Sequence, residues 1–475
     1  MAAERGTVTS LPVDMMIRSR NLFIFSLTLL ATTVLCRTMV RAAEHAEKLS
    51  ADPKIAAALR QISAQRIQAD IEKLVSFQTR LTLSAQDPES IKAGHGIGAA
   101  REWIKGEFES YSRDCGGCLD VKTDGFTEGP VDRIPEPTVI TNVYAALKGT
   151  DPESANRIVL VTGHYDSRNS NSFDVSGTAP GANDDASGTA VSLECARVLS
   201  QLKFPASIIF LTVAGEEQGL NGSSHFAKMA KAQGWDIEAA LNNDIVGGNR
   251  DPQQDPTVVR VFSEGVPITT TEKDLHLIRN LGGESDSTSR QVARYIAEVG
   301  RTYNTGVKPL LEFRLDRYLR GGDHISFNEE GYAAVRFTEF REDFNRQHQN
   351  IRTENGIEYG DVAKWVNFDY VANVARLNAA ALASLASAPA PPGKVRLQAK
   401  DLENNSTITW EASPGNPSYA VMWRATISPE WEHSQVVGKV THTTLPISKD
   451  NVIFAGRAVD SEGHGSLPVV PQPER

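Results

Sequence analysis

Cysteine is scarce in this chain, with four residues among 475. So few thiols exclude a disulfide-rich scaffold and a cluster of metal-binding thiolates. Positive charge is also in short supply, because 49 Lys and Arg face 59 Asp and Glu and leave a net charge of -10. A chain of this sign repels phosphate backbones, so we expect no nucleic-acid partner.

Long apolar runs are nearly absent, and only Leu22–Cys36 (LFIFSLTLLATTVLC) stands out. Arg18 and Arg20 precede this run and the small-residue segment 40–42 follows it, which is the order of a secretory signal. A permanent span needs about 20 apolar residues, so the run is short for one, and an uncleaved anchor is the alternative. We therefore expect residues 1–42 to be a signal peptide, the mature protein to be secreted or periplasmic (extracytoplasmic), and no stable membrane insertion after cleavage.

The remaining cysteines are expected to be structural. Cys115 and Cys118 enclose two glycines and, in an oxidising compartment, are expected to close a local disulfide. A redox-active Cys-x-x-Cys pair is the alternative, but no thioredoxin-like βαβ pattern surrounds it. Cys195 has apolar neighbours in a helical pattern and is expected to be a buried thiol.

The periodicity of apolar residues predicts strands that alternate with helices as far as residue 385. Continuous apolar runs predict strands buried on both faces at 157–162 and 207–213. Further strands are expected at 138–147, 239–246, 257–262, 310–315 and 333–337. Helical spacing predicts helices at 53–78, 96–112, 186–202, 223–233, 287–303 and 361–385. This alternation favours the α/β class, as a three-layer sandwich with a mostly parallel mixed sheet between helices.

The character of the sequence changes at the Pro/Ala segment 386–393 (ASAPAPPG). The residues beyond it have no helical period. Strands are expected there at 395–397, 407–410, 419–425, 436–440 and 452–459. A run of short strands separated by turn residues predicts a small all-β sandwich. We therefore expect an α/β domain over 43–385, a linker at 386–393 and an all-β domain over 394–475.

Five polar motifs lie at predicted strand ends or helix starts, which is the edge where open α/β sheets bind ligands. They are HYDS (164–167), GANDDASG (181–188), GEEQG (215–219), NNDIVG (242–247) and GGDH (321–324). Each motif is a weak signal alone, because each has an ordinary explanation. HYDS could be a surface His–Asp pair, GANDDASG could place acids at a helix start to complement its dipole, and GEEQG could be a solvated acidic turn. Together they supply two histidines, four or five carboxylates and no thiolate. Such nitrogen and oxygen ligands suit a catalytic zinc site.

The number of carboxylates favours two metal ions. Two divalent ions that face three carboxylates and one hydroxide come close to neutral charge, which a partly buried site tolerates. One carboxylate is then left for proton transfer. Asp166 lies two residues after His164 on an extended backbone, so its carboxylate can fix the imidazole tautomer. Competing motifs are absent from the sequence: HExxH, GxSxG, the Walker loop and GxGxxG.

The ordered motifs resemble those of the co-catalytic dizinc aminopeptidases, the family of bacterial leucyl aminopeptidase and aminopeptidase Y, over about residues 65–385. The resemblance implies a metallo-exopeptidase that binds two Zn²⁺ and hydrolyses peptide or protein substrates. It also implies the metal ligands, with Asp184 bridging both ions. His164 and Asp244 would complete one site, and Glu217 and His324 would complete the other.

The resemblance further implies how hydrolysis proceeds. A hydroxide between the two metal ions would attack the peptide carbonyl, with Glu216 as general base and then general acid. Asp166 would not bind metal but would hydrogen-bond to His164 and orient its ring. The family often has a cis peptide after the bridging aspartate, so we expect one between Asp184 and Asp185.

The last segment, 392–475, resembles a fibronectin type III domain. The resemblance rests on Trp410, on Tyr419 and Trp423, and on the segment 457–463 (RAVDSEG). Such modules normally perform no chemistry. We therefore expect this domain to serve attachment, spacing or domain packing, with contact to a surface or polymer as one outcome.

Other functions fit the same scaffold. Arg317 and Arg320, just upstream of His324, would suit a carboxypeptidase or dipeptidase if they clamp a substrate carboxylate. A glutaminyl cyclase, which transfers rather than hydrolyses, is a second alternative. Outside the enzymes, a catalytically silent binding protein is the competing interpretation, and zinc analysis would distinguish it.

Overall fold

A mixed sheet of eight strands forms the centre of the computed structural model, which describes residues 49–474. The predicted signal peptide, 1–42, lies outside these residues. The strands are β1 (Leu119–Glu128), β2 (Thr138–Leu147), β3 (Arg157–His164), β4 (Ser207–Val213), β5 (Asp236–Asn243), β6 (Val258–Ser263), β7 (Lys308–Glu312) and β8 (Ala334–Glu339). Their order in the sheet is β1-β2-β4-β3-β5-β8-β6-β7. The central strands β4, β3, β5 and β8 run parallel to one another, so their carboxyl ends meet at one edge.

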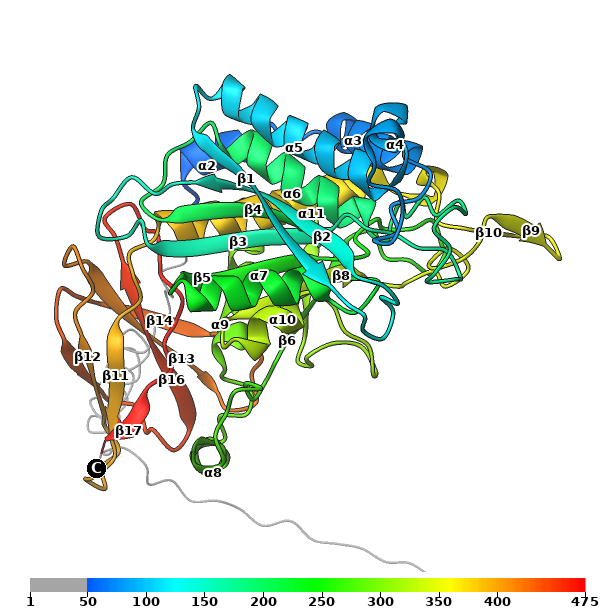
Figure 1. Ribbon diagram of the computed structural model, residues 1–475. Coiled ribbons are helices and arrows are strands. Elements are labelled where there is room, and N and C mark those ends of the chain that lie inside the picture. Colours follow the sequence, from blue (N-terminus) through cyan, green and yellow to red (C-terminus); the bar gives the residue numbers. More distant parts are fainter. Residues whose placement is uncertain (1–48, 475) are drawn as a thin grey trace, which may run out of the picture. The chain divides into compact units, whose positions relative to one another are not determined.

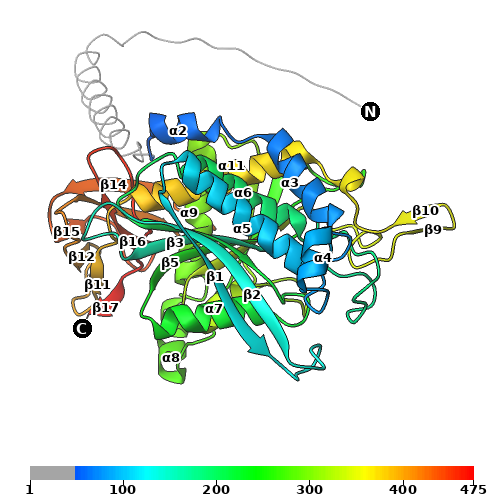
Figure 2. The same ribbon diagram turned by 45° about the horizontal axis from the view of Figure 1, so that its top comes forward.

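Helices cover both faces of the sheet, as Figures 1 and 2 show for the layers above and below the central strands. The helices are α2 (Pro53–Leu59), α3 (Ala64–Ser76), α4 (Pro88–Ala93), α5 (Gly96–Asp114), α6 (Ala186–Leu199), α7 (Asn221–Ala232), α8 (Glu272–Leu281), α9 (Thr288–Tyr303), α10 (His324–Glu329), the short 3₁₀ turn η1 (Ala363–Trp365) and α11 (Phe368–Ser387). Helices α2, α3, α5, α6, α9 and α11 share the larger apolar core. Helices α7 and α10 share the smaller core on the opposite face. The predicted α/β class and three-layer arrangement are confirmed.

Several elements differ from the sequence expectation. The helix expected at 53–78 is two helices, because Ser63 accepts from the backbone N–H of Arg66 and starts a second helix. Strand β1 was not expected. It is an edge strand that pairs with β2 along its whole length and buries only Leu119, so its sequence has no apolar pattern that marks a strand. Helix α8 was also missed, and it buries none of its residues.

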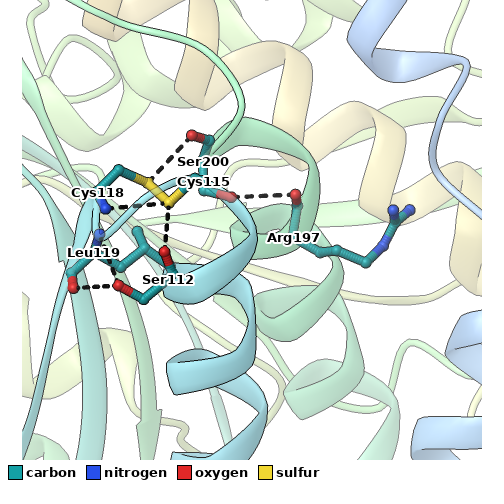
Figure 3. Close-up of a disulfide and its surroundings, with 6 residues drawn as sticks. All are labelled: Ser112, Cys115, Cys118, Leu119, Arg197 and Ser200. Atoms are coloured by element: carbon teal, nitrogen blue, oxygen red, sulfur yellow. Dashed lines mark hydrogen bonds between the residues drawn. A yellow bond between two sulfur atoms is a disulfide. The ribbon is translucent and has the colours of Figure 1, made fainter.

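The disulfide predicted between Cys115 and Cys118 is present and closes the turn between α5 and β1 (Figure 3). Next to it, Ser112 Oγ donates to the carbonyl of Leu119 at 2.8 Å. Cys195 is a buried free thiol, as expected.

Two small sheets follow α11. Their strands are β11 (Gly393–Gln398), β12 (Ser406–Glu411), β13 (Ser418–Ala425), β14 (His433–Gly438), β15 (His442–Leu445), β16 (Val452–Val459) and β17 (Gln472–Glu474). One sheet has the order β15-β12-β11-β17 and the other β14-β13-β16. Before α11, a short hairpin of β9 (Arg352–Glu354) and β10 (Ile357–Tyr359) forms a separate two-stranded sheet. The C-terminal sheets enclose their own apolar cluster, which includes Trp410 and Tyr419.

Polar and charged side chains join the C-terminal sheets to α9 and to the segment just before it. Arg457 donates to both carboxylate oxygens of Glu298 at 2.9 and 2.8 Å, and Arg424 donates to Asp286 at 2.6 Å. Trp431 Nε1 donates to Gln291 at 3.2 Å. Within residues 49–474, no helix has both the length and the apolar character needed to cross a membrane.

Candidate metal centre

The parallel strands bring the polar motifs to one edge of the sheet. His164 is the last residue of β3, Glu216 and Glu217 follow β4, and Asp244 follows β5 directly. Asp184 lies in the loop that leads into α6. The parallel arrangement therefore gathers side chains that are far apart in the sequence, as the motif positions predict.

The first cluster joins His164, Glu216 and Asp244, whose ligand atoms all lie within 4.8 Å of one another. His164 Nε2 is buried and has no hydrogen-bond partner. It lies 3.2 Å from Asp184 Oδ1 and 3.9 Å from Asp244 Oδ1. An imidazole nitrogen without a partner among carboxylates has the setting of a metal ligand.

The second cluster joins Asp184, Glu217 and His348. His348 Nε2 lies 3.0 Å from Asp184 Oδ2 and 3.0 Å from Glu217 Oε1. Asp184 thus presents Oδ1 toward the first cluster and Oδ2 toward the second. A single carboxylate between two sets of donors suits the bridging position of a two-metal site.

Asp166 connects the first histidine to the turn that carries the glutamates. Its backbone carbonyl lies 3.1 Å from His164 Nδ1, and its carboxylate lies 3.4 Å from the same nitrogen. The carboxylate also accepts from the N–H of Glu217 at 3.1 Å and from Thr82 Oγ1 at 2.9 Å. Asp166 therefore fixes both the His164 ring and the Glu216–Glu217 backbone.

The backbone around Asp184 is held from several sides. Asp361 accepts from the N–H groups of Asn183 and Asp184 at 2.9 and 2.8 Å. Arg80 is fully buried and donates to the carbonyls of Pro180 and Gly181 at the start of this loop. The expected cis peptide between Asp184 and Asp185 is present.

Asp185 does not face the donors but caps α6. Its carboxylate accepts from the N–H of Gly188 at 2.9 Å and from the N–H of His164 at 3.1 Å. Of the two adjacent acids, one therefore supports the helix start, and only Asp184 points toward both clusters.

Two arginines support the ligands from outside. Arg168 Nε donates to Glu217 Oε2 at 2.8 Å. The buried Arg336 lies 3.0 Å from Asp244 Oδ2 and 3.0 Å from Asp316 Oδ2. Each arginine contacts one oxygen of a carboxylate whose other oxygen faces a cluster, so it orients that carboxylate.

The electrostatics of the clusters favour a bound cation. Burial raises the pKa of Glu216 well above its usual range; His164 opposes this shift, while the carboxylates of Asp244 and Glu217 add to it. Burial disfavours the charged form of His348, but Glu217 and Asp184 outweigh it and raise the pKa of His348 to about 10. Four carboxylates thus crowd one buried site, and its nitrogen and oxygen donors suit zinc.

Comparisons with known proteins identify the family. Residues 142–368 match peptidase family M28. A probable zinc metalloprotease of Pyrenophora teres f. teres (strain 0-1) is 46% identical over 429 residues, which cover 89% of this chain and 87% of the relative. A probable zinc metalloprotease of Pyricularia oryzae (strain 70-15 / ATCC MYA-4617 / FGSC 8958) is 44% identical, with 89% and 85% covered.

The chain belongs to peptidase family M28. It is thus a zinc metalloprotease, in agreement with the donor set of the two clusters. Among solved structures, LapA from Legionella pneumophila has a TM-score of 0.51 at 23% identity, with 72% of this chain and 79% of that chain covered. LapB from the same organism has a TM-score of 0.50 at 19% identity, with 74% and 81% covered. These likenesses concern the fold.

In this M28 peptidase the structure corrects one expected ligand, because it does not bring His324 into either cluster. His324 Nε2 lies 2.9 Å from the carbonyl of Leu315 and 3.8 Å from Asp316 Oδ2. His324 starts α10, and from there its ring turns toward the loop after β7. The histidine beside Asp184 and Glu217 is His348, which was not among the expected ligands.

A signal for His348 was nevertheless present in the sequence. It follows the carboxyl end of β8, as the other motifs follow β3, β4 and β5. No glycine-rich motif marks it, and its loop is long, so the rule that ligands lie at strand ends would have found it only if applied to every strand. Gln347 beside it was also missed, and its Nε2 donates to Asp184 Oδ2 at 2.9 Å.

Proposed function

We propose that this M28 peptidase is a secreted aminopeptidase with two zinc ions. The observation that carries the proposal is that Asp184 directs one oxygen to each of two neighbouring donor clusters. The first ion would be held by His164 and Asp244, and the second by Glu217 and His348. This set replaces His324 by His348 and otherwise keeps the ligands implied by the resemblance.

Zinc ions held there would polarise the peptide carbonyl and acidify a water molecule, which makes it a nucleophile near neutral pH. Glu216 belongs to the first cluster but is left free by this assignment of ligands. Its carboxylate accepts the proton of the attacking water and returns it to the departing amine.

The choice of the amino end rests on the motif resemblance to leucyl aminopeptidases, and one solved LapA structure is described as an aminopeptidase. Secretion is supported by the apolar run near the start of the sequence and by the Cys115–Cys118 disulfide, since disulfides persist in oxidising compartments. Finding the protein in the culture medium with its first residue near 43 would support secretion, and an intact, cell-bound chain would contradict it.

The central test uses Glu216→Gln, an isosteric change that removes the base. We expect the variant to keep its zinc content and to lose about 10²- to 10⁴-fold in kcat. Zinc analysis and turnover of a short peptide are the measurements. Glu153→Gln is the matched control, because Glu153 is an exposed glutamate outside both donor clusters. Wild-type turnover in Glu216→Gln would rule out its role as the base.

The substrate end is tested with short peptides blocked at either terminus, with and without chelator. We expect cleavage of peptides with a free amino group and a blocked carboxyl terminus, and none when the amino group is acetylated. Cleavage of the acetylated peptides at an equal rate would contradict an aminopeptidase.

A further inference from the structure

Two arginines in the loop between β7 and α10 have different surroundings. Arg317 is nearly buried, and its three nitrogens donate to Asp316, Glu342 and the carbonyl of Gly321 at 2.9 Å each. Arg320 uses only Nη1, which donates to Glu342 at 2.7 Å. Its side chain is 33% exposed, and within residues 49–474 its Nε and Nη2 have no hydrogen-bond partner. Arg317 is therefore a structural residue, whereas Arg320 has a free guanidinium edge.

Arg320 shares its only carboxylate partner with other arginines. Glu342 lies within ion-pair distance of Arg260, Arg317 and Arg320, and the neighbouring Arg336 pairs with Asp244 and Asp316. A metal ion on Asp244 would add further positive charge. The other three arginines are 17% exposed or less, so Arg320 is the arginine of this group that can reach an anion from solvent.

The loop that carries Arg320 passes close to the metal centre. The backbone of Gly322 passes so near Asp244 that a Cβ there would be 3.2 Å from Asp244 Oδ2. Arg336 links the two segments, because it contacts Asp244 and also donates to the carbonyl of Gly321 at 2.8 Å. Burial lowers the pKa of Arg320, but the carboxylates of Glu342, Asp184 and Asp244 hold it above its usual value.

The surface beside Arg320 is apolar. Tyr318, Leu319 and Phe344 are exposed, and the Arg320 guanidinium carbon lies 5.8 Å from the centre of the Phe344 ring. An arginine edge bordered by apolar side chains suits a ligand that combines a carboxylate with a hydrocarbon side chain.

We propose that Arg320 binds a carboxylate of the substrate at the mouth of the metal centre, so that the enzyme prefers short peptides with a free carboxyl terminus. This inference rests on the proposed aminopeptidase function and names its substrate class as di- and tripeptides. The free Nε and Nη2 match the two carboxylate oxygens, which a lysine in the same place would not. The same edge would also accept an aspartate or glutamate side chain, so the test separates the two sources.

The test compares wild type with Arg320→Gln, Arg320→Lys and Arg314→Gln. Arg314 is a matched control, because it lies on the same loop, is exposed and stacks on Tyr318 at 4.1 Å. The substrates are a dipeptide and a tripeptide of apolar residues as free acids, the same peptides as amides, and the amides with a glutamate at the last position. Zinc content and the melting temperature of each variant are measured alongside.

We expect wild type and Arg314→Gln to favour the free acids over the apolar amides by about 10- to 100-fold in kcat/KM. Arg320→Gln should abolish this preference through KM, at unchanged zinc content, and Arg320→Lys should restore it only in part. Because Glu342 keeps Arg260 and Arg317 as partners, Arg320→Gln should fold normally.

Three results would overturn the proposal. Wild type could cleave acids and apolar amides equally well, or Arg320→Gln could reduce both to the same extent. If only the glutamate-bearing amides had a higher kcat/KM than the apolar amides, the preference for short free acids would be refuted. Arg320 would then bind an acidic side chain instead. Failure of the aminopeptidase function itself is recognised separately, because wild type would then cleave none of the peptides with a free amino group.

Discussion

At the scale of single residues, the centre depends on which nitrogens remain available. His164 Nε2 is buried among carboxylates without a hydrogen bond, whereas His324 Nε2 is paired with a backbone carbonyl and its unpaired Nδ1 belongs to neither cluster. His348 Nε2 lies 3.0 Å from each of two carboxylate oxygens. His164 and His324 are both buried and both belong to strand-end motifs, so exposure and motif do not separate the ligand from the non-ligand, but the surroundings of their nitrogens do.

This difference predicts opposite effects on metal content. His348→Ala should lower bound zinc from two ions to about one per chain, because the second cluster loses its nitrogen donor. His324→Ala should keep both ions. Metal analysis after dialysis measures the outcome. Equal loss from both variants, or loss from His324→Ala alone, would restore His324 as the ligand.

At the scale of helices and strands, polar groups buried between elements influence stability. Asp70 on α3 is 5% exposed, and its Oδ2 has no hydrogen-bond partner. Burial raises the pKa of Asp70 to about 8, Glu107 on α5 adds to the shift, and Arg66 opposes it. The folded protein therefore keeps this carboxyl protonated at neutral pH, whereas the unfolded chain ionises it near pH 4.

Stability should accordingly depend on pH through Asp70. Between about pH 4 and 8 the folded state binds one more proton than the unfolded state, so the free energy of unfolding falls as pH rises, by up to about 1.4 kcal/mol per unit. Asp70→Asn stays neutral and should remove this loss, which makes the variant more stable than wild type at pH 8 and similar at pH 4. Urea unfolding at both pH values measures the difference, and parallel pH curves would refute it.

At the scale of the whole described chain, residues 49–474, the C-terminal sheets are bound to the catalytic part by specific pairs. Arg457 is 4% exposed and makes a two-point contact with Glu298, and Arg424 is 3% exposed and contacts Asp286. Only residues 388–392 separate α11 from β11, fewer than the expected linker. The C-terminal sheets are therefore held by these side-chain contacts as well as by the short covalent connection.

Breaking one of these pairs should loosen the C-terminal sheets. Arg457→Ala leaves Glu298 without its partner and should reduce the free energy of unfolding by about 2–4 kcal/mol, with faster proteolysis near residues 388–392. Lys394→Ala removes an exposed pair with Glu411 and should change stability by less than about 0.5 kcal/mol. Denaturant unfolding and limited proteolysis measure both, and equal effects would contradict a specific docking contact.

Periodicity, cysteine spacing and strand-end motifs are local signals, and they were enough to predict the α/β class, most strands and helices, the Cys115–Cys118 disulfide and the position of Asp184. They did not determine the fifth ligand, which is the second nitrogen donor. His348 reaches the donors because the long loop after β8 returns across the edge of the sheet, and loop paths depend on contacts between distant residues. For the same reason only the tertiary structure separated Arg317 from Arg320: both are arginines of one loop, and their packing decides which guanidinium stays free.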